Sequence, residues 1–235
     1  MTDNATLPSE IDLDKLFSKA ALFDSIHNLD QAGFHIVRGS SDGRVTVAGH
    51  PSVPGYLFKK FLKDVPHPHA KQLASYERRV KGSRELKTHL ETFGIHSIVV
   101  PRKWLCELPS RFSSGGKPEY VVVVEKCNFL GHDESKRRYR EIDKDALKEL
   151  CTIFFTFKHV DFSSRNMPFT PEGKIAFIDT GYLTRITEDL TFRRSNYRKN
   201  YNKLFTESTT QFAKSLWNEF ARRHDLLTTP SPRTK

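Results

Sequence analysis

Hydrophobic positions in the first sixty residues change from a helical to a β-strand period. Between residues 11 and 26 the apolar side chains recur at helical spacing, which predicts one amphipathic helix. They are Ile11, Leu16, Phe17, Ala20, Phe23 and Ile26. Short β-rich runs follow at 34–38, 44–49 and 55–62, separated by the turn-forming sequences SSDG and HPSVPG. We therefore expect three consecutive antiparallel strands after the helix.

A long helical segment and two further strands come next. Residues 69–93 have apolar side chains roughly on one helical face, and Gly94 is a typical residue for ending a helix. The apolar runs at 97–100 and 120–125 have the length and composition of strands. The first half of the chain thus predicts three strands, one helix and two strands.

The second half is mainly helical. A charged linker is expected at 131–143, a helix at 144–157, and a tight hairpin where the apolar runs at 167–169 and 175–178 flank Pro171, Glu172 and Gly173. Further helices are predicted at 192–204 and 209–224. The last eleven residues, 225–235, contain ThrPro and SerPro pairs and are expected to be disordered.

Charge indicates a phosphate-bearing or acidic partner without identifying it. The 235 residues include 38 lysines and arginines and 28 acidic residues, a formal net charge of +10. Nucleic acid, an anionic membrane surface, a nucleotide and an acidic protein would all be attracted to such a chain. The positions of the basic residues are therefore needed to choose among these partners.

Compartment is indicated by the cysteines and the N-terminus. Cys106, Cys127 and Cys151 form an odd, widely spaced set without a CxxC pair, which argues against a disulfide framework and a zinc site. The sequence has no basic signal-peptide start and no apolar run of the roughly 18 residues that span a membrane. We expect a cytoplasmic protein, or one secreted into a host cell without a cleavable signal.

Two motifs in the second half have the spacing of a catalytic centre. His159, Asp161 and Asn166 form the pattern H-x-D-x-x-x-x-N, and Asp179-Thr-Gly181 begins thirteen residues after Asn166, beyond the predicted hairpin. This arrangement resembles the catalytic loop and metal-binding motif of the protein kinase superfamily. Val160 and Thr180 depart from the usual residues, no lysine follows two residues after Asp161, and no A-P-E sequence follows Asp179.

The resemblance implies a role for each matching residue. Asp161 would orient the attacking hydroxyl group and accept its proton, while Asn166 and Asp179 would hold Mg²⁺ (or Mn²⁺) against the phosphates of ATP. His159 and Gly181 would support these residues.

The expected N-lobe residues lie on the strands and the long helix. Lys59 would contact the ATP phosphates. Lys60 is the alternative, because neighbouring strand residues face opposite sides of a sheet and a shift of one residue in the strand register would exchange them. Glu77, with Glu85 as the weaker candidate, would form a salt bridge with this lysine. A salt bridge from Lys59 to Glu77 is the expected pairing, with Lys60 and Glu85 kept as the alternatives.

Two further segments would complete the nucleotide site. The turn between the first two strands would cover the phosphates, although it lacks the full glycine pattern, and its residues are Gly39, Ser40, Ser41, Gly43 and Val45. Backbone groups of Glu125 and Cys127 would bind the adenine edge at a hinge after the last N-lobe strand.

These expectations combine into a two-lobed α+β fold. It would have an N-terminal extension at 1–29, an N-lobe of five antiparallel strands and one helix at 30–128, a reduced helical C-lobe at 129–225, and a disordered tail at 226–235. Only 56 residues follow Asp179, and this short C-lobe is similar to that of compact bacterial effector kinases. The resemblance implies an ATP-dependent protein kinase.

Other functions of the same fold stay open. They are a pseudokinase or binding module, a lipid or small-molecule kinase, and a nucleotidyl transferase; a basic nucleic-acid-binding protein would instead make the resemblance accidental. The basic clusters at 136–140 and 193–203 would recruit a protein substrate with an acidic surface or an inositol phosphate, more naturally than nucleic acid.

Overall fold

The computed structural model describes residues 7–18, 25–39, 45–61, 69–112, 117–158, 160, 163–181, 183–185 and 205–228. The chain divides into two compact units, which we describe separately. The first contains residues 1–84 and 101–127, and the second contains residues 85–100 and 128–235. The predicted lobe boundary at 128/129 stays a prediction. Within the described ranges, no helix is long and apolar enough to cross a membrane.

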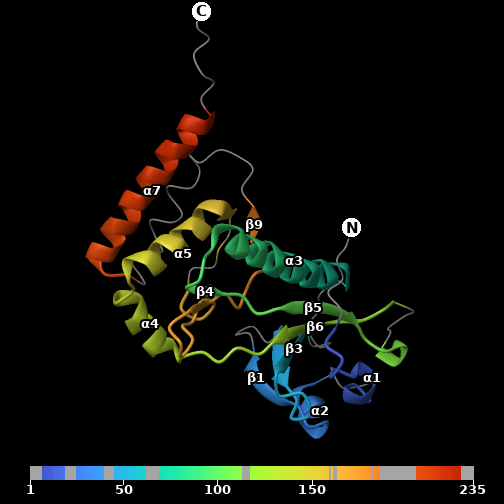
Figure 1. Cartoon of the computed structure of the whole chain (residues 1–235). Helices are drawn as coiled ribbons and strands as arrows, with labels where there is room; N and C mark the ends of the chain where they lie inside the picture. Colours follow the sequence, from blue (N-terminus) through green and yellow to red (C-terminus); the bar gives the residue numbers. More distant parts are fainter. Residues whose placement is uncertain are drawn as a thin grey trace, which may run out of the picture. The chain divides into compact units, whose positions relative to one another are not determined.

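An antiparallel five-stranded sheet forms the centre of the first unit (Figure 1). The strands β1 (His35–Gly39), β2 (Val45–Gly49), β3 (Tyr56–Phe61) and β6 (Tyr120–Glu125) confirm the sequence prediction. The strand order is β1-β2-β3-β6-β5. The edge strand β5 (Lys103–Glu107) was not predicted, and it takes the place in the sheet that the sequence assigned to residues 97–100.

The two faces of this sheet pack against different elements. Because side chains alternate along a strand, Phe58, Val121 and Val123 share one face, while Phe61 and Val122 share the other. The first face is covered by the N-terminal segment, whose buried residues include Ile11, Leu16, Phe17, Leu29 and Phe34. Tyr76 and Val80 of the long helix α3 (His69–Phe93) cover the second face.

The N-terminal segment is two short helices, so the prediction of one continuous helix is wrong. Asp12 is the N-cap of helix α1 (Leu13–Leu16), and its side chain accepts a hydrogen bond from the N–H of Lys15. Phe17 is the C-cap of this helix. Ser25 is the N-cap of helix α2 (Ile26–Gln31). Its backbone is extended, and its side chain accepts a hydrogen bond from the N–H of Asn28. Helical geometry therefore stops at Phe17 and starts again after Ser25, and residues 19–24 lie outside the described ranges.

Arg111 explains why the chain leaves the helix at Phe17. This arginine follows β5 in the short 3₁₀ helix η1 (Ser110–Phe112). Its guanidinium group donates to the carbonyl oxygens of Asp14 and Phe17 at 2.6 to 2.9 Å. The last carbonyl groups of α1 are thus satisfied by a side chain rather than by another helical turn.

The second unit is built around an apolar core shared by helices and short strands. Strand β4 (Ile98–Val99) pairs in parallel with β8 (Ile175–Ala176), and β7 (Phe157–Lys158) pairs with β9 (Thr184–Arg185). Helix α5 (Lys144–Thr156), predicted from the sequence, buries Leu147, Leu150, Ile153 and Phe154 in this core.

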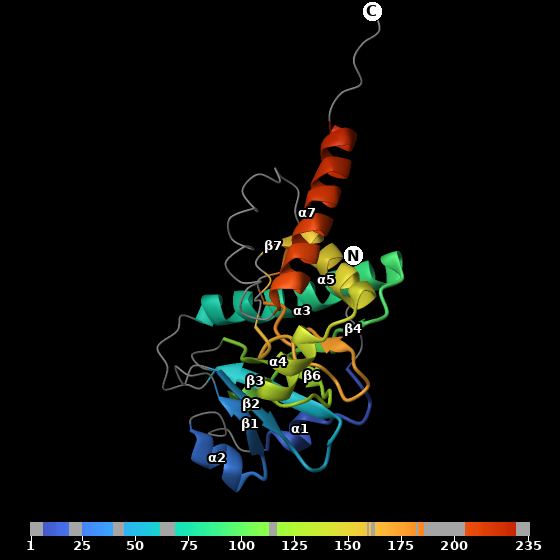
Figure 2. The same cartoon turned by 90° about the vertical axis from the view of Figure 1, so that its left-hand side faces the viewer.

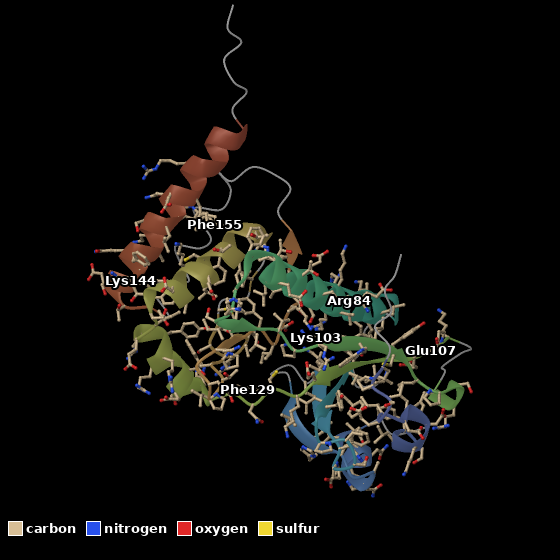
Figure 3. All side chains as sticks on the ribbon, viewed as in Figure 1. Arg84, Lys103, Glu107, Phe129, Lys144 and Phe155 are labelled. Atoms are coloured by element: carbon tan, nitrogen blue, oxygen red, sulfur yellow. The ribbon has the colours of Figure 1, made fainter. Side chains whose placement is uncertain are left out.

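Helix α7 (Glu207–Thr228) runs beside α5 in the second unit (Figure 2). The ring of Phe155, which is labelled in Figure 3, stacks on the ring of Trp217 with ring centres 4.0 Å apart. The predicted helix at 209–224 is confirmed. It continues to Thr228, so the prediction of disorder is wrong for residues 225–228. The predicted helix at 192–204 and residues 229–235 lie outside the described ranges.

Residues 131–143 contain a helix, which corrects the prediction of a charged linker. Helix α4 (His132–Arg140) has acidic residues in its first turn and three arginines in its last turn, an order that matches the helix dipole. Only Ser135 and Tyr139 of this helix are fully buried. The apolar periodicity was too weak to predict the helix, because its stability comes from charge pairs and from two buried polar groups.

Candidate functional site

The hairpin between the two catalytic motifs brings them together. Its turn confirms the prediction: Gly173 has φ of +83° and donates to the carbonyl oxygen of Thr170 at 3.0 Å. At the open end, the N–H of Ile178 donates to the carbonyl oxygen of Asn166 at 3.0 Å. Asn166 therefore lies across the hairpin from Ile178, the residue directly before Asp179. Asp179 comes thirteen positions after Asn166 in the sequence.

Local hydrogen bonds fix the backbone around both motif residues. The N–H of Asn166 donates to the carbonyl oxygen of Ser163 at 3.0 Å, which makes a tight turn. The Asp179 carboxylate accepts a hydrogen bond from the N–H of Gly181 at 3.1 Å. Thr180 and Gly181 are buried, whereas Asn166 and Asp179 are half-buried. The two oxygen-bearing side chains thus sit on a constrained backbone and retain access to solvent.

The chemistry of this pair fits magnesium. An amide oxygen and a carboxylate are the hard donors that Mg²⁺ takes from proteins, with waters and substrate phosphates supplying its other ligands. No cluster of three or more His, Cys, Asp or Glu side chains that could hold a metal occurs among the described residues. A cation held by Asn166 and Asp179 would therefore need ligands from the substrate or from residues outside the described ranges.

Lys59 and Lys60 of β3 face opposite sides of the sheet. Lys59 pairs with Val122 and Val47, which places it on the face covered by the first part of α3. Lys60 is on the opposite face and is buried, where its ammonium group contacts Glu119 at 2.6 Å and the carbonyl oxygen of Tyr120 at 3.3 Å. The two lysines that the sequence could not distinguish therefore have different surroundings.

The two candidate glutamates lie on α3. Glu77 is exposed, next to the buried Tyr76, and belongs to the part of the helix in the first unit. Glu85 is half-buried and belongs to the second unit. The predicted salt bridge from Lys59 to Glu77, or to Glu85, stays a prediction.

The hinge residues follow the last strand of the sheet. The backbone N–H of Glu125 donates to the carbonyl oxygen of Arg102 at 2.9 Å, and its carboxylate accepts two hydrogen bonds from the Arg102 guanidinium group. The N–H of Lys126 donates to the carbonyl oxygen of Gly55 at 2.8 Å. Cys127 is half-buried. A ligand could not use the N–H of Glu125 as a donor without displacing Arg102.

Several predicted site residues cannot be placed. His159, Asp161, Ser40, Ser41 and Gly43 lie outside the described ranges. Of the remaining loop residues, Gly39 ends β1 opposite Thr46. Val45 begins β2 opposite Phe61, and therefore shares the face of the sheet that carries Lys59.

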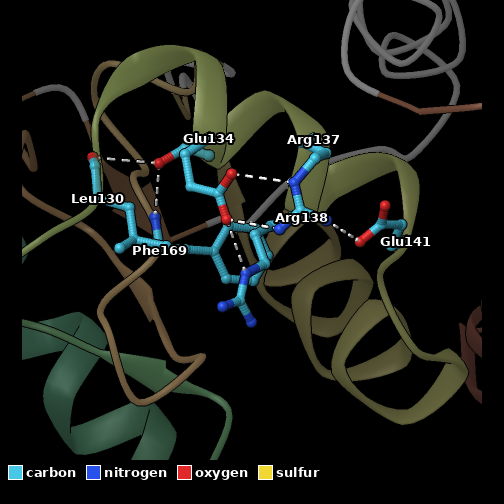
Figure 4. A network of polar contacts seen from close by, with 7 residues as sticks. Leu130, Glu134, Arg137, Arg138, Glu141 and Phe169 are labelled. Atoms are coloured by element: carbon cyan, nitrogen blue, oxygen red, sulfur yellow. Dashed lines mark hydrogen bonds and ion pairs between the residues drawn. The ribbon is translucent and has the colours of Figure 1, made fainter.

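Two arginines of the basic cluster on α4 are paired with acids of the helix and its C-cap. Arg137 contacts Glu134 and Glu141 at 2.7 Å each, and Arg138 contacts Glu134 at 3.4 Å (Figure 4). These contacts lower the pKa of the Glu134 carboxyl group, chiefly through its hydrogen bond with Arg137. Two of the four basic residues at 136–140 are thus engaged within the helix, which weakens the case for this cluster as a docking surface.

The sequence analysis missed two groups of polar residues near these elements. Lys103 is buried and shares the α3-covered face with Lys59, since it pairs with Val124 (Figure 3). Lys103 was missed because it begins β5, a strand that the sequence analysis did not predict. His132, Ser135 and Tyr139 contact the segment around Asn166, and they were overlooked because their helix was taken for a linker.

No protein-family model matches the sequence, and no curated protein matches it either. Among solved structures, the chain is similar to WbdD at 14% identity and a TM-score of 0.44, over 80% of this chain and 45% of that one.

Two further WbdD structures give similar values. A structure of WbdD described as a bifunctional kinase-methyltransferase has 15% identity and a TM-score of 0.43, over 83% of this chain and 45% of that one. A complex of WbdD with a kinase inhibitor has 14% identity and a TM-score of 0.41, over 76% of this chain and 44% of that one. The chain spans less than half the length of these WbdD chains.

Proposed function

We propose that this chain is an ATP-dependent phosphotransferase of the EC 2.7 class with a reduced protein-kinase-like fold, which transfers the γ-phosphoryl group to a hydroxyl group of a protein. The observation that carries this proposal is the hydrogen bond between Ile178 and Asn166. It gives the two motifs the adjacency that a shared metal site requires, and chance matches to short motifs would not predict it.

The proposed chemistry uses two sets of residues. In the second unit, Asn166 and Asp179 would hold the metal through their side-chain oxygen atoms, and Asp161 would accept the proton of the acceptor hydroxyl group. Magnesium, when bound, would neutralise negative charge on the phosphates. In the first unit, Lys59 would bind the phosphates and Glu77 would orient its ammonium group. Catalysis would depend on positioning and on charge neutralisation.

Lys59 is a better candidate than Lys60 for the phosphate contact. The ammonium group of Lys60 already contacts Glu119 and the Tyr120 carbonyl oxygen on the face covered by the N-terminal segment. A phosphate bound there would have to displace a buried ion pair, which costs several kcal/mol. Val45 lies on the same face as Lys59, and so would cover the nucleotide from the adjacent strand.

The nucleotide base and the phosphate tail would contact backbone groups at the ends of the strands. The adenine edge would contact the Glu125 carbonyl oxygen and the Cys127 N–H. The loop from Gly39 to Gly43 would cover the phosphates. The acceptor would be a protein with an acidic surface, in the cytoplasm or in a host cell, and an inositol phosphate is the alternative ligand. Cys106, Cys127 and Cys151 form no disulfide, which fits a reducing compartment.

The test uses γ-labelled and α-labelled ATP separately, each with Mg²⁺ and a cell lysate as the source of acceptors. We expect transfer of label from the γ position only, and its loss in Asp179→Asn. Asparagine keeps an oxygen that can accept from the Gly181 N–H, so this variant removes charge while preserving the turn. Asp145→Ala, which changes an exposed acid on α5, is the matched control and should keep full activity.

Other outcomes would contradict the proposal in distinguishable ways. Label from the α position would indicate nucleotidyl transfer, and label in a lipid or small molecule would identify another acceptor class. ATP binding without transfer would indicate a pseudokinase or binding module. A salt-dependent shift of nucleic acid without ATP binding would identify a nucleic-acid-binding protein.

A further inference from the structure

Helix α4 contacts the segment that carries Asn166 through three side chains on one helical face. His132, Ser135 and Tyr139 are spaced i, i+3 and i+7, and residues at this spacing project from the same side of a helix. Their partners are Ser164, Phe169 and Met167, all in the segment from 163 to 169. A helix and an irregular segment are thus joined at three points within the second unit.

The two contacts after Asn166 are buried and directed at the backbone. The hydroxyl group of Tyr139 donates to the carbonyl oxygen of Met167 at 2.7 Å, and the Ser135 hydroxyl group accepts from the N–H of Phe169 at 3.2 Å. Just before α4, the N–H of Leu130 donates to the carbonyl oxygen of Phe169 at 2.7 Å. These bonds fix the backbone directly after Asn166.

The contact before Asn166 is between two side chains. Nδ1 of His132 lies 2.9 Å from the hydroxyl oxygen of Ser164, whose residue is 2% exposed. The hydroxyl group can donate to Nδ1 in one imidazole tautomer and accept from it in the other. Ser164 also lies three residues after Asp161 and two before Asn166, so the contact falls between the two proposed catalytic positions.

We propose that His132 is a positioning residue, which acts through Ser164 to hold residues 163–166, directly before and including Asn166, in their reactive geometry. This inference rests on the proposed function and adds a role that the motifs themselves do not contain. Without His132, the bonds to Met167 and Phe169 would still hold one end of the segment, and the other end would be less constrained. A displacement of about 1 Å at a catalytic group can lower a rate about a hundredfold.

The kinetic test compares His132→Ala, Ser164→Ala and the double variant. We expect kcat for γ-phosphoryl transfer to fall about ten- to a hundredfold in each, with less than a twofold change in the Kd for ATP measured by calorimetry. Because the two side chains act as one unit, the double variant should lose no more than either single variant. Additive losses, or equal losses in kcat and ATP affinity, would overturn the proposal.

A conservative variant and a matched control separate positioning from folding. His132→Asn offers an amide group near the position of Nδ1 and should restore kcat to within about threefold of the wild type. His96→Ala removes an exposed histidine of the same unit and should change neither kcat nor Kd. Failure of the asparagine variant to restore kcat would count against a hydrogen-bonding role.

Hydrogen exchange tests the same inference without measuring activity. In His132→Ala the amides of Asn166 and Met167 should exchange at least about tenfold faster, while those of α5 should be unchanged. Unchanged exchange at Asn166 and Met167, or faster exchange throughout α5, would overturn the positioning role. If the wild type transfers no phosphoryl group, the proposed function fails, and the exchange comparison still decides whether His132 restrains this segment.

Discussion

The ammonium group of Lys60 lies 2.6 Å from the carboxylate of Glu119, with the two side chains only 4% and 13% exposed. The pair joins β3 to the residue before β6 on the face of the sheet that the N-terminal segment covers. Removing one partner would leave the other charge buried without its counterion, which costs more than the intact pair contributes.

We expect Lys60→Met and Glu119→Gln each to lower the free energy of unfolding by about 3 kcal/mol. The double variant Lys60→Met/Glu119→Leu should regain most of that loss, because it leaves no unpaired charge. Urea denaturation monitored by circular dichroism gives these values. Lys59→Met is the comparison on the same strand: it should abolish ATP binding, whereas loss of ATP binding in Lys60→Met alone would assign the phosphate contact to Lys60.

Arg111 should stabilise the first unit through carbonyl groups rather than through its ion pair. It donates to the carbonyl oxygens of Asp14 and Phe17, and it also contacts the exposed carboxylate of Asp14. We expect Arg111→Ala to lower the free energy of unfolding by about 1 to 2 kcal/mol. Asp14→Ala should have little measurable effect, because exposed ion pairs contribute little. Equal losses would show that the charge is the stabilising part.

Gly94 should be hard to replace because of its backbone conformation alone. Its φ is +61°, the N–H of Ile95 donates to the carbonyl oxygen of Leu90 at 2.9 Å, and a Cβ atom at Gly94 would meet no other atom within 4 Å. We expect Gly94→Ala to lower the melting temperature, with a loss of about 1 kcal/mol. Gly94→Asn should lose less, because asparagine tolerates this conformation. A neutral alanine variant would contradict this explanation.

Stability should fall at alkaline pH through the Cys106 thiol. Burial raises the pKa of Cys106 from 9.0 to about 12. Above pH 9 the unfolded chain loses this proton while the folded protein keeps it, so the free energy of unfolding decreases until about pH 12, by up to about 1.4 kcal/mol per pH unit. Burial also raises the pKa of Tyr76 and Tyr139, which adds to the decrease above pH 10. Cys106→Ala should flatten the profile between pH 9 and 10, as measured by urea titrations.

Strands and helices with strong local signals could be predicted from the sequence. The turn after β2 and the hairpin at Gly173 have residues that favour one backbone conformation, and α3 combines an apolar face with a terminating glycine. These features depend on neighbouring residues, which the sequence contains. The adjacency of Asn166 and Asp179 was predictable for the same reason, because a short hairpin joins them.

Elements that depend on distant partners could not be predicted. Residues 97–100 have the composition of a strand, but no local pattern indicates that β4 pairs in parallel with β8 in the second unit rather than within the five-stranded sheet. Strand β5 contains Lys103, whose burial depends on the surrounding fold. Helix α4 depends on its bonds to Met167 and Phe169, nearly thirty residues or more away in sequence.

The N-terminal segment closes one face of the five-stranded sheet. Phe17 stacks on Phe34 and meets the edge of Phe58, so an aromatic cluster seals the face that carries Lys60. A ligand that contacts Lys59 or Val45 would therefore lie on the other face of the sheet, where Tyr76 and Val80 of α3 also pack. Removing the residues before β1 would expose Phe58 and the other apolar side chains of the Lys60 face to solvent.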